Sequence, residues 1–180
     1  DQIDHKITNL DQLISNLIPW VLVQSKNDES HHSRINLRTL VDQIVLQQSS
    51  NISSKHLIVV NIASSIYNVV ADATAIEIIV RNLLSNAIKF SLSGGKIEIL
   101  TSSDNSFIYL LVKDEGVGMT EEEASEIFSK YTSSAGTAGE EGHGLGLKLS
   151  RDLAIRNGGS LEISSVKGEG TVASLKLPLS

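Results

Sequence analysis

The chain has 180 residues, and its 41% hydrophobic content is enough for a globular domain with an appendage. Its 21 acidic residues outnumber its 15 basic residues, and a formal charge of −6 without a dense Lys/Arg cluster argues against nucleic acid as a partner. The absence of cysteine excludes disulfides and thiolate metal sites and indicates a reducing, cytoplasmic environment.

Membrane contact is expected only through segments upstream of this sequence. The apolar runs fall short of the ~20 residues that a membrane-spanning helix needs, and no apolar leader opens the chain. Because the sequence begins at Asp1 and its only methionine is Met119, we expect it to be part of a longer protein.

Residues 1–25 carry an apolar seam with alternating spacings of four and three. The seam positions are Ile3, Ile7, Leu10, Ile14, Leu17 and Val21. One helix cannot bury such a seam alone, so pairing with another helix in a bundle or coiled coil is predicted. An amphipathic helix lying on its own domain is the alternative. Residues 26–35 are polar and aperiodic, which is typical of a linker, and the main domain is predicted over residues 36–180.

The main domain is predicted to mix helices and strands. Helices are expected after a cap at Asn36, from a cap at Asp72 to Ser91, from 120 to 131 and from 145 to 157. Strands are expected at 57–62, 67–70, 96–101, 107–113, 161–166 and 171–177. Because this order lacks a regular βαβ alternation, the predicted fold class is α+β, a two-layer sandwich of helices on a sheet.

The helix predicted to begin after Asp72 carries a polar stripe. At 3.6 residues per turn, Asn82, Asn86 and Lys89 share a narrow sector, and apolar residues occupy another side. Asparagine is a mediocre helix former, so its use twice in this stripe suggests a chemical role. An exposed stripe that happens to use asparagine is the alternative.

Glycine-bearing turns occur at three joints of the predicted fold. They read DEGVGM at 114–119, GHGLGL at 142–147 and GEGT at 168–171. The second precedes a helix, whose N-terminal N–H groups and dipole suit phosphate. No GxxxxGK[ST] loop occurs, and GHGLGL does not directly follow a strand as the GxGxxG fingerprint requires. Taken singly, each turn also fits an ordinary tight turn.

The order of these motifs carries a specific resemblance. NLLSNAIKF, DEGVGM, IFSKY, GHGLGL and GEGT together resemble the ATP-binding catalytic domain of sensor histidine kinases, in the superfamily that includes gyrase, chaperone and mismatch-repair ATPases. The resemblance covers about residues 36–180 and implies a Bergerat-type α/β sandwich. Residues 1–25 look like the second helix of the dimerisation and phosphotransfer hairpin, which implies a homodimer in the full-length protein.

The resemblance implies a site for ATP and Mg²⁺. Asn86 would coordinate Mg²⁺ through its amide oxygen, Asn82 would assist, and Lys89 would approach phosphate, so these three are the candidate catalytic residues. One protein ligand can suffice because Mg²⁺ usually keeps waters and substrate phosphates. Asp114 would accept a hydrogen bond from the adenine amino group.

Further nucleotide contacts are implied by the same motifs. The candidates are Phe90, Gly116, Gly118, Met119, Tyr131, Gly142, His143, Gly144, Leu145, Gly146, Leu147 and Thr171. The chain between Met119 and Gly142 would form a lid over the phosphates. Phe90 stands where many relatives have tyrosine, and Tyr131 stands where phenylalanine is common. For His143, a solvated lid residue is the favoured interpretation.

Position 82 favours phosphoryl transfer over hydrolysis. The hydrolysing relatives carry a glutamate base one turn before the metal asparagine, where this chain has Asn82, and an amide takes no proton at neutral pH. ATP should therefore stay intact for another nucleophile. Glu77 lies about 140° around the helix from Asn82, so it is interpreted as structural.

In the phosphoacceptor motif of the family, a histidine is followed by an acidic residue. None of the five histidines of this chain matches that motif. They are His5, His31, His32, His56 and His143. The acceptor is therefore expected upstream of Asp1, and autophosphorylation of these 180 residues alone is not expected.

The sequence thus predicts the catalytic domain of a sensor histidine kinase, with a response regulator receiver domain as a partner. Two alternatives remain. One is a degenerate module that holds nucleotide and acts by docking a response regulator. The other is a serine-directed relative such as an anti-sigma factor kinase, which the seam helix and the linker disfavour.

Overall fold

A computed structural model describes residues 32–62, 68–129, 136–139 and 145–179. The helix predicted over 1–25 lies outside these residues, as does most of the linker. The last residues of the predicted linker differ from expectation, because β1 (His32–Asn36) pairs antiparallel with β3 (Asn68–Asp72). Ile35 is buried opposite Val69 in this ribbon. The strand was not predicted because a single apolar residue among polar ones gives no periodic signal.

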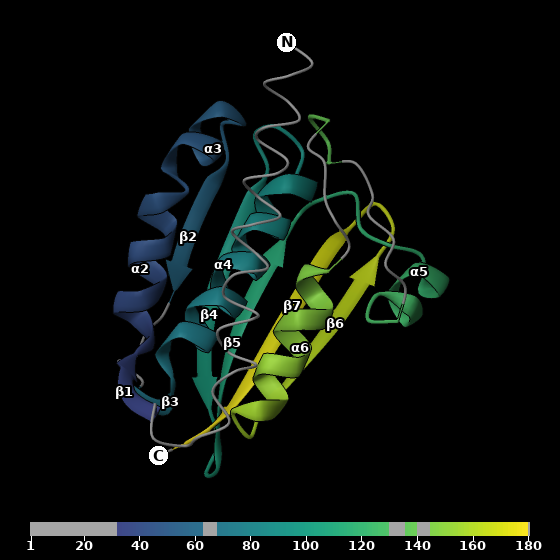
Figure 1. The fold of residues 1–180 in the computed structure, drawn as a ribbon. Coiled ribbons are helices and arrows are strands. Elements are labelled where there is room, and N and C mark those ends of the chain that lie inside the picture. The colour runs from purple at the N-terminus through teal and green to yellow at the C-terminus, as the bar shows by residue number, and fades with distance from the viewer. Residues whose placement is uncertain (1–31, 63–67, 130–135, 140–144, 180) are drawn as a thin grey trace, which may run out of the picture.

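The remaining strands form one sheet in the order β2-β4-β5-β7-β6. Their bounds are β2 (Ile58–Ile62), β4 (Lys96–Ser103), β5 (Phe107–Asp114), β6 (Ser160–Val166) and β7 (Gly170–Pro178). Neighbours are antiparallel except β2 and β4, which run parallel. Helices α2 (Leu37–Gln47), α4 (Ala73–Phe90) and α6 (Gly146–Arg156) lie side by side over one face of the sheet (Figure 1). The predicted two-layer α+β sandwich is confirmed.

The core lies between these two layers, and the sequence periods explain it. Along β5, Ile108, Leu110 and Val112 are buried at alternate positions, as a half-covered sheet requires. Helix α4 buries its apolar side against the sheet, including the residues Ile76, Val80, Leu83, Leu84 and Ala87. Because this side is fully used for packing, the polar stripe of α4 is left at its margin.

Two helices begin at the caps that the sequence predicts. The Asn36 side chain accepts a hydrogen bond from the backbone N–H of Thr39 at 3.0 Å, and α2 follows. The Asp72 carboxylate accepts from the N–H groups of Thr74 and Ala75 at 2.9 and 3.1 Å, and α4 follows. Each side chain satisfies N–H groups that have no partner within the helix.

Helix α5 (Glu121–Glu126) is shorter than the predicted helix over 120–131. Thr120 and Glu123 form a capping box at its start, so the predicted beginning is confirmed. The helix buries no residue of its own, and the turn that follows brings Phe128 against the core, with the Arg151 guanidinium 4.8 Å from the ring centre. Packing of this aromatic ring therefore ends the helix early.

Helix α3 (Ser49–Ser54) was not predicted, because its polar sequence buries no residue and has no apolar period. None of the helices within the described ranges combines the length and apolar character needed to cross a membrane.

Candidate functional site

The polar stripe of α4 lies beside the N-terminal end of α6. Asn82, Asn86 and Lys89 are each half-buried. The Asn82 amide nitrogen donates to the Ser150 hydroxyl of α6 at 2.9 Å, and Ser150 is fully buried. This hydrogen bond fixes the amide of Asn82, and it identifies Ser150 as a site residue that the sequence analysis missed.

Gly146 permits a close approach between α6 and the stripe. A Cβ atom at this position would lie 2.3 Å from the Asn82 amide oxygen, which is closer than any side chain tolerates. The preceding residue, Leu145, provides no side-chain cap for α6. The N-terminal end of a helix without such a cap presents N–H groups and partial positive charge, which together suit an anionic group beside Asn82.

Lys89 and Phe90 end the stripe at the C-terminal end of α4. The Lys89 ammonium lies 4.7 Å from the centre of the Phe90 ring, so a cation–π contact joins the two side chains. The Phe90 carbonyl accepts from the N–H of Val117 at 3.2 Å. The DEGVGM turn is therefore attached directly to the end of α4.

Asp114 is the last residue of β5 and is only 6% exposed. Burial raises the pKa of its carboxyl group to about 6, although hydrogen bonds from the backbone N–H groups of Gly116 and Thr171 act in the opposite direction. At neutral pH the group is therefore mostly ionised and can accept a hydrogen bond from a buried ligand.

Gly116 brings the backbone close to Asp114. A Cβ atom at Gly116 would lie 2.4 Å from the Phe90 carbonyl oxygen and 2.6 Å from the Asp114 carboxylate. Glycine at this position therefore allows the turn to pack closely against the end of α4.

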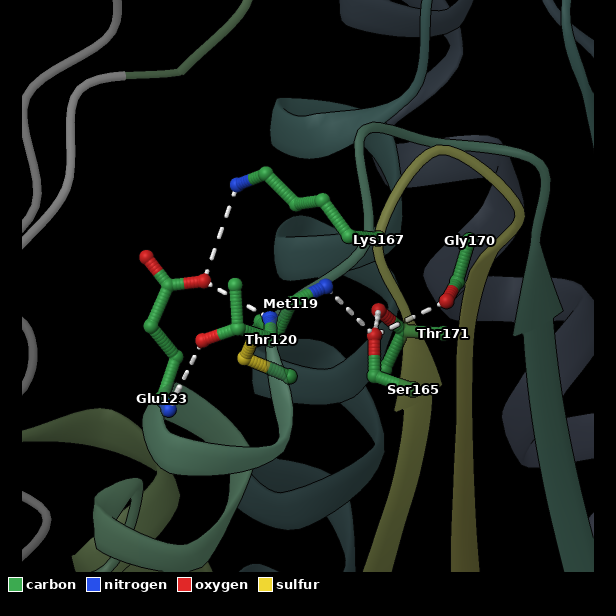
Figure 2. Close-up of polar contacts among 7 residues, drawn as sticks. All are labelled: Met119, Thr120, Glu123, Ser165, Lys167, Gly170 and Thr171. Carbon is green, nitrogen blue, oxygen red and sulfur yellow. Dashed lines mark hydrogen bonds and ion pairs between the residues drawn. The ribbon is translucent and has the colours of Figure 1, made fainter.

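A hydroxyl cluster joins the DEGVGM turn to the GEGT turn (Figure 2). Ser165 of β6 accepts from the N–H of Met119 at 2.9 Å and donates to the Gly170 carbonyl at 2.8 Å. The hydroxyls of Ser165 and Thr171 are 2.9 Å apart. Ser165 was missed from the sequence because its place in an alternating strand gives no signal for such a contact.

A hollow of about 600 Å³ opens on the other side of this cluster, between α5 and β6. Met119, Thr120 and Lys167 contribute to its lining. Lys167 also forms an ion pair of 3.6 Å with Glu123 of α5 (Figure 2). Of the predicted nucleotide contacts that lie within the described ranges, only Met119 lines this hollow, and no residue of the polar stripe lines it.

A buried lysine at the end of α4 was also missed. Lys55 is 8% exposed, and its ammonium donates to the carbonyls of Ile88 and Lys89 at 2.9 and 2.8 Å and to the Thr137 hydroxyl at 2.7 Å. Lysine side chains often bind the last carbonyls of a helix, but they usually come from its own last turn. Ile88 and Thr137 lie 33 and 82 positions after Lys55, and no sequence pattern connects residues so far apart.

The structure brings most of the predicted site residues around α4, α6 and the two turns. Those in the described ranges are Asn82, Asn86, Lys89, Phe90, Asp114, Gly116, Gly118, Met119, Leu145, Gly146, Leu147 and Thr171. Leu147 packs against the core, and Glu77 forms an ion pair with Arg81, consistent with its structural interpretation. Tyr131, Gly142, His143 and Gly144 lie outside the described residues.

Residues 71–180 match a known family, the histidine kinase-, DNA gyrase B- and HSP90-like ATPases. The adaptive-response sensory kinase SasA of Crocosphaera subtropica is 28% identical over 184 residues, covering 99% of this chain and 48% of SasA. Histidine protein kinase DivJ of Caulobacter vibrioides is 37% identical over 110 residues, covering 61% of this chain and 18% of DivJ. The chain thus spans about half or less of these curated relatives.

Solved structures show the same fold. The nucleotide-free catalytic domain of histidine kinase ThkA has a TM-score of 0.72 at 25% identity, over 82% of this chain and 95% of that chain. Full-length ShkA in complex with AMPPNP has a TM-score of 0.80 at 21% identity, over 96% of this chain and 36% of that chain. The chain belongs to the family of histidine kinase-, DNA gyrase B- and HSP90-like ATPases, and it contains the ATP-binding catalytic domain found in sensor histidine kinases.

Proposed function

We propose that the chain acts in a two-component sensor kinase, where it binds Mg-ATP and transfers the γ-phosphoryl group to a histidine outside these 180 residues. The observation that carries the proposal is the fixed amide of Asn82. Its nitrogen donates to Ser150 at 2.9 Å, so the side chain that stands one turn before Asn86 is an oriented amide without basic character. Without a base at this position, ATP is held for an acceptor instead of being hydrolysed.

Adenine is proposed to bind at Asp114. The carboxylate is nearly buried, and it accepts from the Gly116 N–H at 2.9 Å with further accepting capacity for an adenine amino group. A guanine base presents a carbonyl oxygen at the corresponding position and would repel the ionised group.

The phosphates are proposed to lie along the stripe of α4 toward the N-terminal end of α6. Lys89 supplies positive charge at one end, and the uncapped start of α6 supplies N–H groups at the other. Transfer of a phosphoryl group depends mainly on positioning and on neutralisation of negative charge, which is what these groups provide.

Magnesium is proposed to bind through the amide oxygen of Asn86. Among the described residues, no group of three or more His, Cys, Asp or Glu side chains is placed to hold a metal ion. A half-buried amide fits a hard cation that takes most of its ligands from phosphates and water. The bound ion would neutralise phosphate charge, and Asn86 would orient it.

The partners and the location of the whole protein are also proposals. ThkA has been solved in complex with the response regulator TrrA, and its fold matches this chain with a TM-score of 0.74. We therefore propose a response regulator receiver domain as a partner. Pairing of residues 1–25 into a homodimer and a cytoplasmic location are proposed on the apolar seam and the cysteine-free composition.

The function is tested by adding the acceptor hairpin of the parent protein in trans with labelled ATP. Wild type should give an acid-labile label on the hairpin, and Asn86→Asp should lose it. Ser85→Ala, at an exposed position of the same helix, is the matched control and should label normally. Equal labelling by Asn86→Asp would contradict the metal role.

Two other results would replace the proposal with its alternatives. Tight ATP binding without any transfer would indicate a nucleotide-binding module, and an acid-stable phosphoserine on a partner would indicate a serine-directed kinase.

A further inference from the structure

The C-terminal end of α4 is held by residues from two distant segments. Lys55 follows α3, and its ammonium donates to the carbonyls of Ile88 and Lys89 at 2.9 and 2.8 Å. The Ser91 carbonyl is farther away, at 3.5 Å. A cation at the carbonyl end of a helix also interacts favourably with the helix dipole.

Thr137 joins the same cluster from the chain between α5 and α6. Its hydroxyl accepts from the Lys55 ammonium at 2.7 Å and lies 2.6 Å from the Ser91 carbonyl, to which it donates. Its backbone N–H donates to the Lys89 carbonyl at 3.1 Å. One threonine thus uses both its backbone and its side chain to bind the end of α4.

Gly146, the first residue of α6, also contacts α4. There it lies against the Asn82 side chain, at the other end of the polar stripe. Asn82 and Lys89 are seven residues apart, which corresponds to about 10 Å along a helix. The contacts at Thr137 and Gly146 therefore fix the chain to α4 at both ends of the stripe that carries Asn86.

We propose that Lys55 is a positioning residue for Mg-ATP binding, because its ammonium holds Thr137 on the carbonyl end of α4. The proposal rests on the proposed function, since it assigns the polar stripe to the phosphates and metal. Lys55 acts through Thr137 and the helix end and does not touch the nucleotide itself.

The energetic reason is the burial of the Lys55 ammonium. A buried charge is costly unless its donors are satisfied, and charge-assisted hydrogen bonds are stronger than neutral ones. The contact with the Thr137 hydroxyl, at 2.7 Å, is the shortest of the four contacts to the ammonium described above. Release of Thr137 would leave the ammonium with one acceptor fewer. The position of Thr137 is therefore coupled to that of the helix end.

The direct test compares Thr137→Val with Thr137→Ser. Valine keeps the size and the backbone N–H but removes the hydroxyl, whereas serine keeps the hydroxyl. We expect Thr137→Val to weaken Mg-ATP binding about five-fold, the worth of one hydrogen bond, and Thr137→Ser to bind like wild type. Because Thr137→Val leaves the buried Lys55 ammonium with one acceptor fewer, it should also lower the thermal stability slightly, and binding is compared at a temperature at which all three proteins are folded. Adenosine, which lacks phosphates, should bind equally to all three proteins.

A second comparison removes the charge. Lys55→Met should weaken Mg-ATP binding at least as much as Thr137→Val, and the double variant should bind no more weakly than Lys55→Met alone. Lys113→Met, at a half-exposed lysine of β5, is the matched control and should not change binding. Additive losses in the double variant would contradict the coupling.

Failure of the inference is distinguishable from failure of the function. If wild type binds Mg-ATP and Thr137→Val binds it equally tightly, the positioning role is wrong and the function stands. If wild type shows no Mg-dependent ATP binding, the proposed function is wrong and the inference falls with it.

Discussion

The two ends of α4 are built in different ways. At its N-terminal end, Asp72 caps the helix with hydrogen bonds to residues two and three positions ahead. At its C-terminal end, the caps are Lys55 and Thr137, which lie 33 residues before and 48 residues after the carbonyls they bind. The local end only starts the helix, whereas the distant end adjoins Lys89, Phe90 and the turn that carries Asp114.

The two ends of α4 therefore depend on different parts of the chain. The side-chain cap at the N-terminal end can form as soon as the local chain is helical, because Thr74 and Ala75 closely follow Asp72 in sequence, although the backbone N–H of Asp72 donates to the distant Asn157 side chain at 2.8 Å. The C-terminal end forms only when α3, α4 and the segment before α6 are assembled. Lys89 and Phe90, which we propose as nucleotide contacts, thus lie at the end of the helix that depends on the complete tertiary structure.

The largest expected effect comes from breaking the distant end. Lys55→Met removes the ammonium that donates to the carbonyls of Ile88 and Lys89, and it should lower the free energy of unfolding by about 3 kcal/mol. Asp72→Ala removes an ordinary N-cap and should cost about 1 kcal/mol. Urea denaturation of both variants measures the difference. A larger loss for Asp72→Ala would show that the comparison is wrong.

Asp114→Asn should raise the free energy of unfolding, whereas Lys55→Met should lower it. The pKa of Asp114 is raised to about 6 by burial, so the ionised group opposes folding at neutral pH. Asparagine keeps an oxygen for the Gly116 N–H and removes the charge. We expect the variant to be more stable than wild type by about 2 kcal/mol at pH 8, and adenine nucleotide binding to be lost.

The pH dependence of this gain follows from the direction of the shift. Between the ordinary aspartate pKa of about 4 and the raised pKa of about 6, the folded wild type binds more protons than the unfolded chain. Its stability relative to Asp114→Asn therefore falls as pH rises through this window and is constant above it. A pH-independent difference in urea midpoints would contradict the burial of a titrating carboxyl group.

A smaller effect is expected at the other end of the stripe. Gly146→Ala places a Cβ atom where the Asn82 amide now lies, so Asn82 must leave Ser150. The clash with Asn82 opposes folding, but alanine is a better helix former than glycine by up to about 1 kcal/mol. The free energy of unfolding should therefore change little. Mg-ATP affinity should fall several-fold, as measured by fluorescence titration with a labelled nucleotide.

Ser150→Ala provides the control for this prediction. It removes the acceptor of the Asn82 hydrogen bond without adding bulk, so its effect on affinity should be smaller than that of Gly146→Ala. The reverse order would show that the close approach at Gly146 has no role in placing Asn82.

The features that the sequence predicts well are those encoded locally. Asn36 and Asp72 were predicted as caps because a cap needs only a short side chain before an apolar period. The separation of α4 into a buried side and a polar stripe follows from its 3.6-residue period. The fold class follows from the order of these elements.

The features that were missed depend on contacts between distant segments. Lys55, Ser150 and Ser165 reach the site through tertiary packing, and their neighbours in sequence show no pattern that marks them. The helix predicted to extend to residue 131 ends at Glu126, and Phe128 packs on the core after it. Local helix propensity does not predict such a tertiary contact. Asn86 stood out through the polar stripe of its helix, whereas Asp114 was singled out, and a metal role was assigned to Asn86, only because whole motifs in order resemble a known domain.

The central claim is that Asn86 on α4 takes part in magnesium-dependent binding of ATP. Isothermal titration of ATP into the folded protein, with and without Mg²⁺, tests it most directly when wild type is compared with Asn86→Ala. The account predicts that Mg²⁺ tightens ATP binding to wild type and has no such effect on Asn86→Ala, while adenosine binds both proteins equally. Binding of ATP to wild type that is absent, or that does not respond to Mg²⁺, would contradict it.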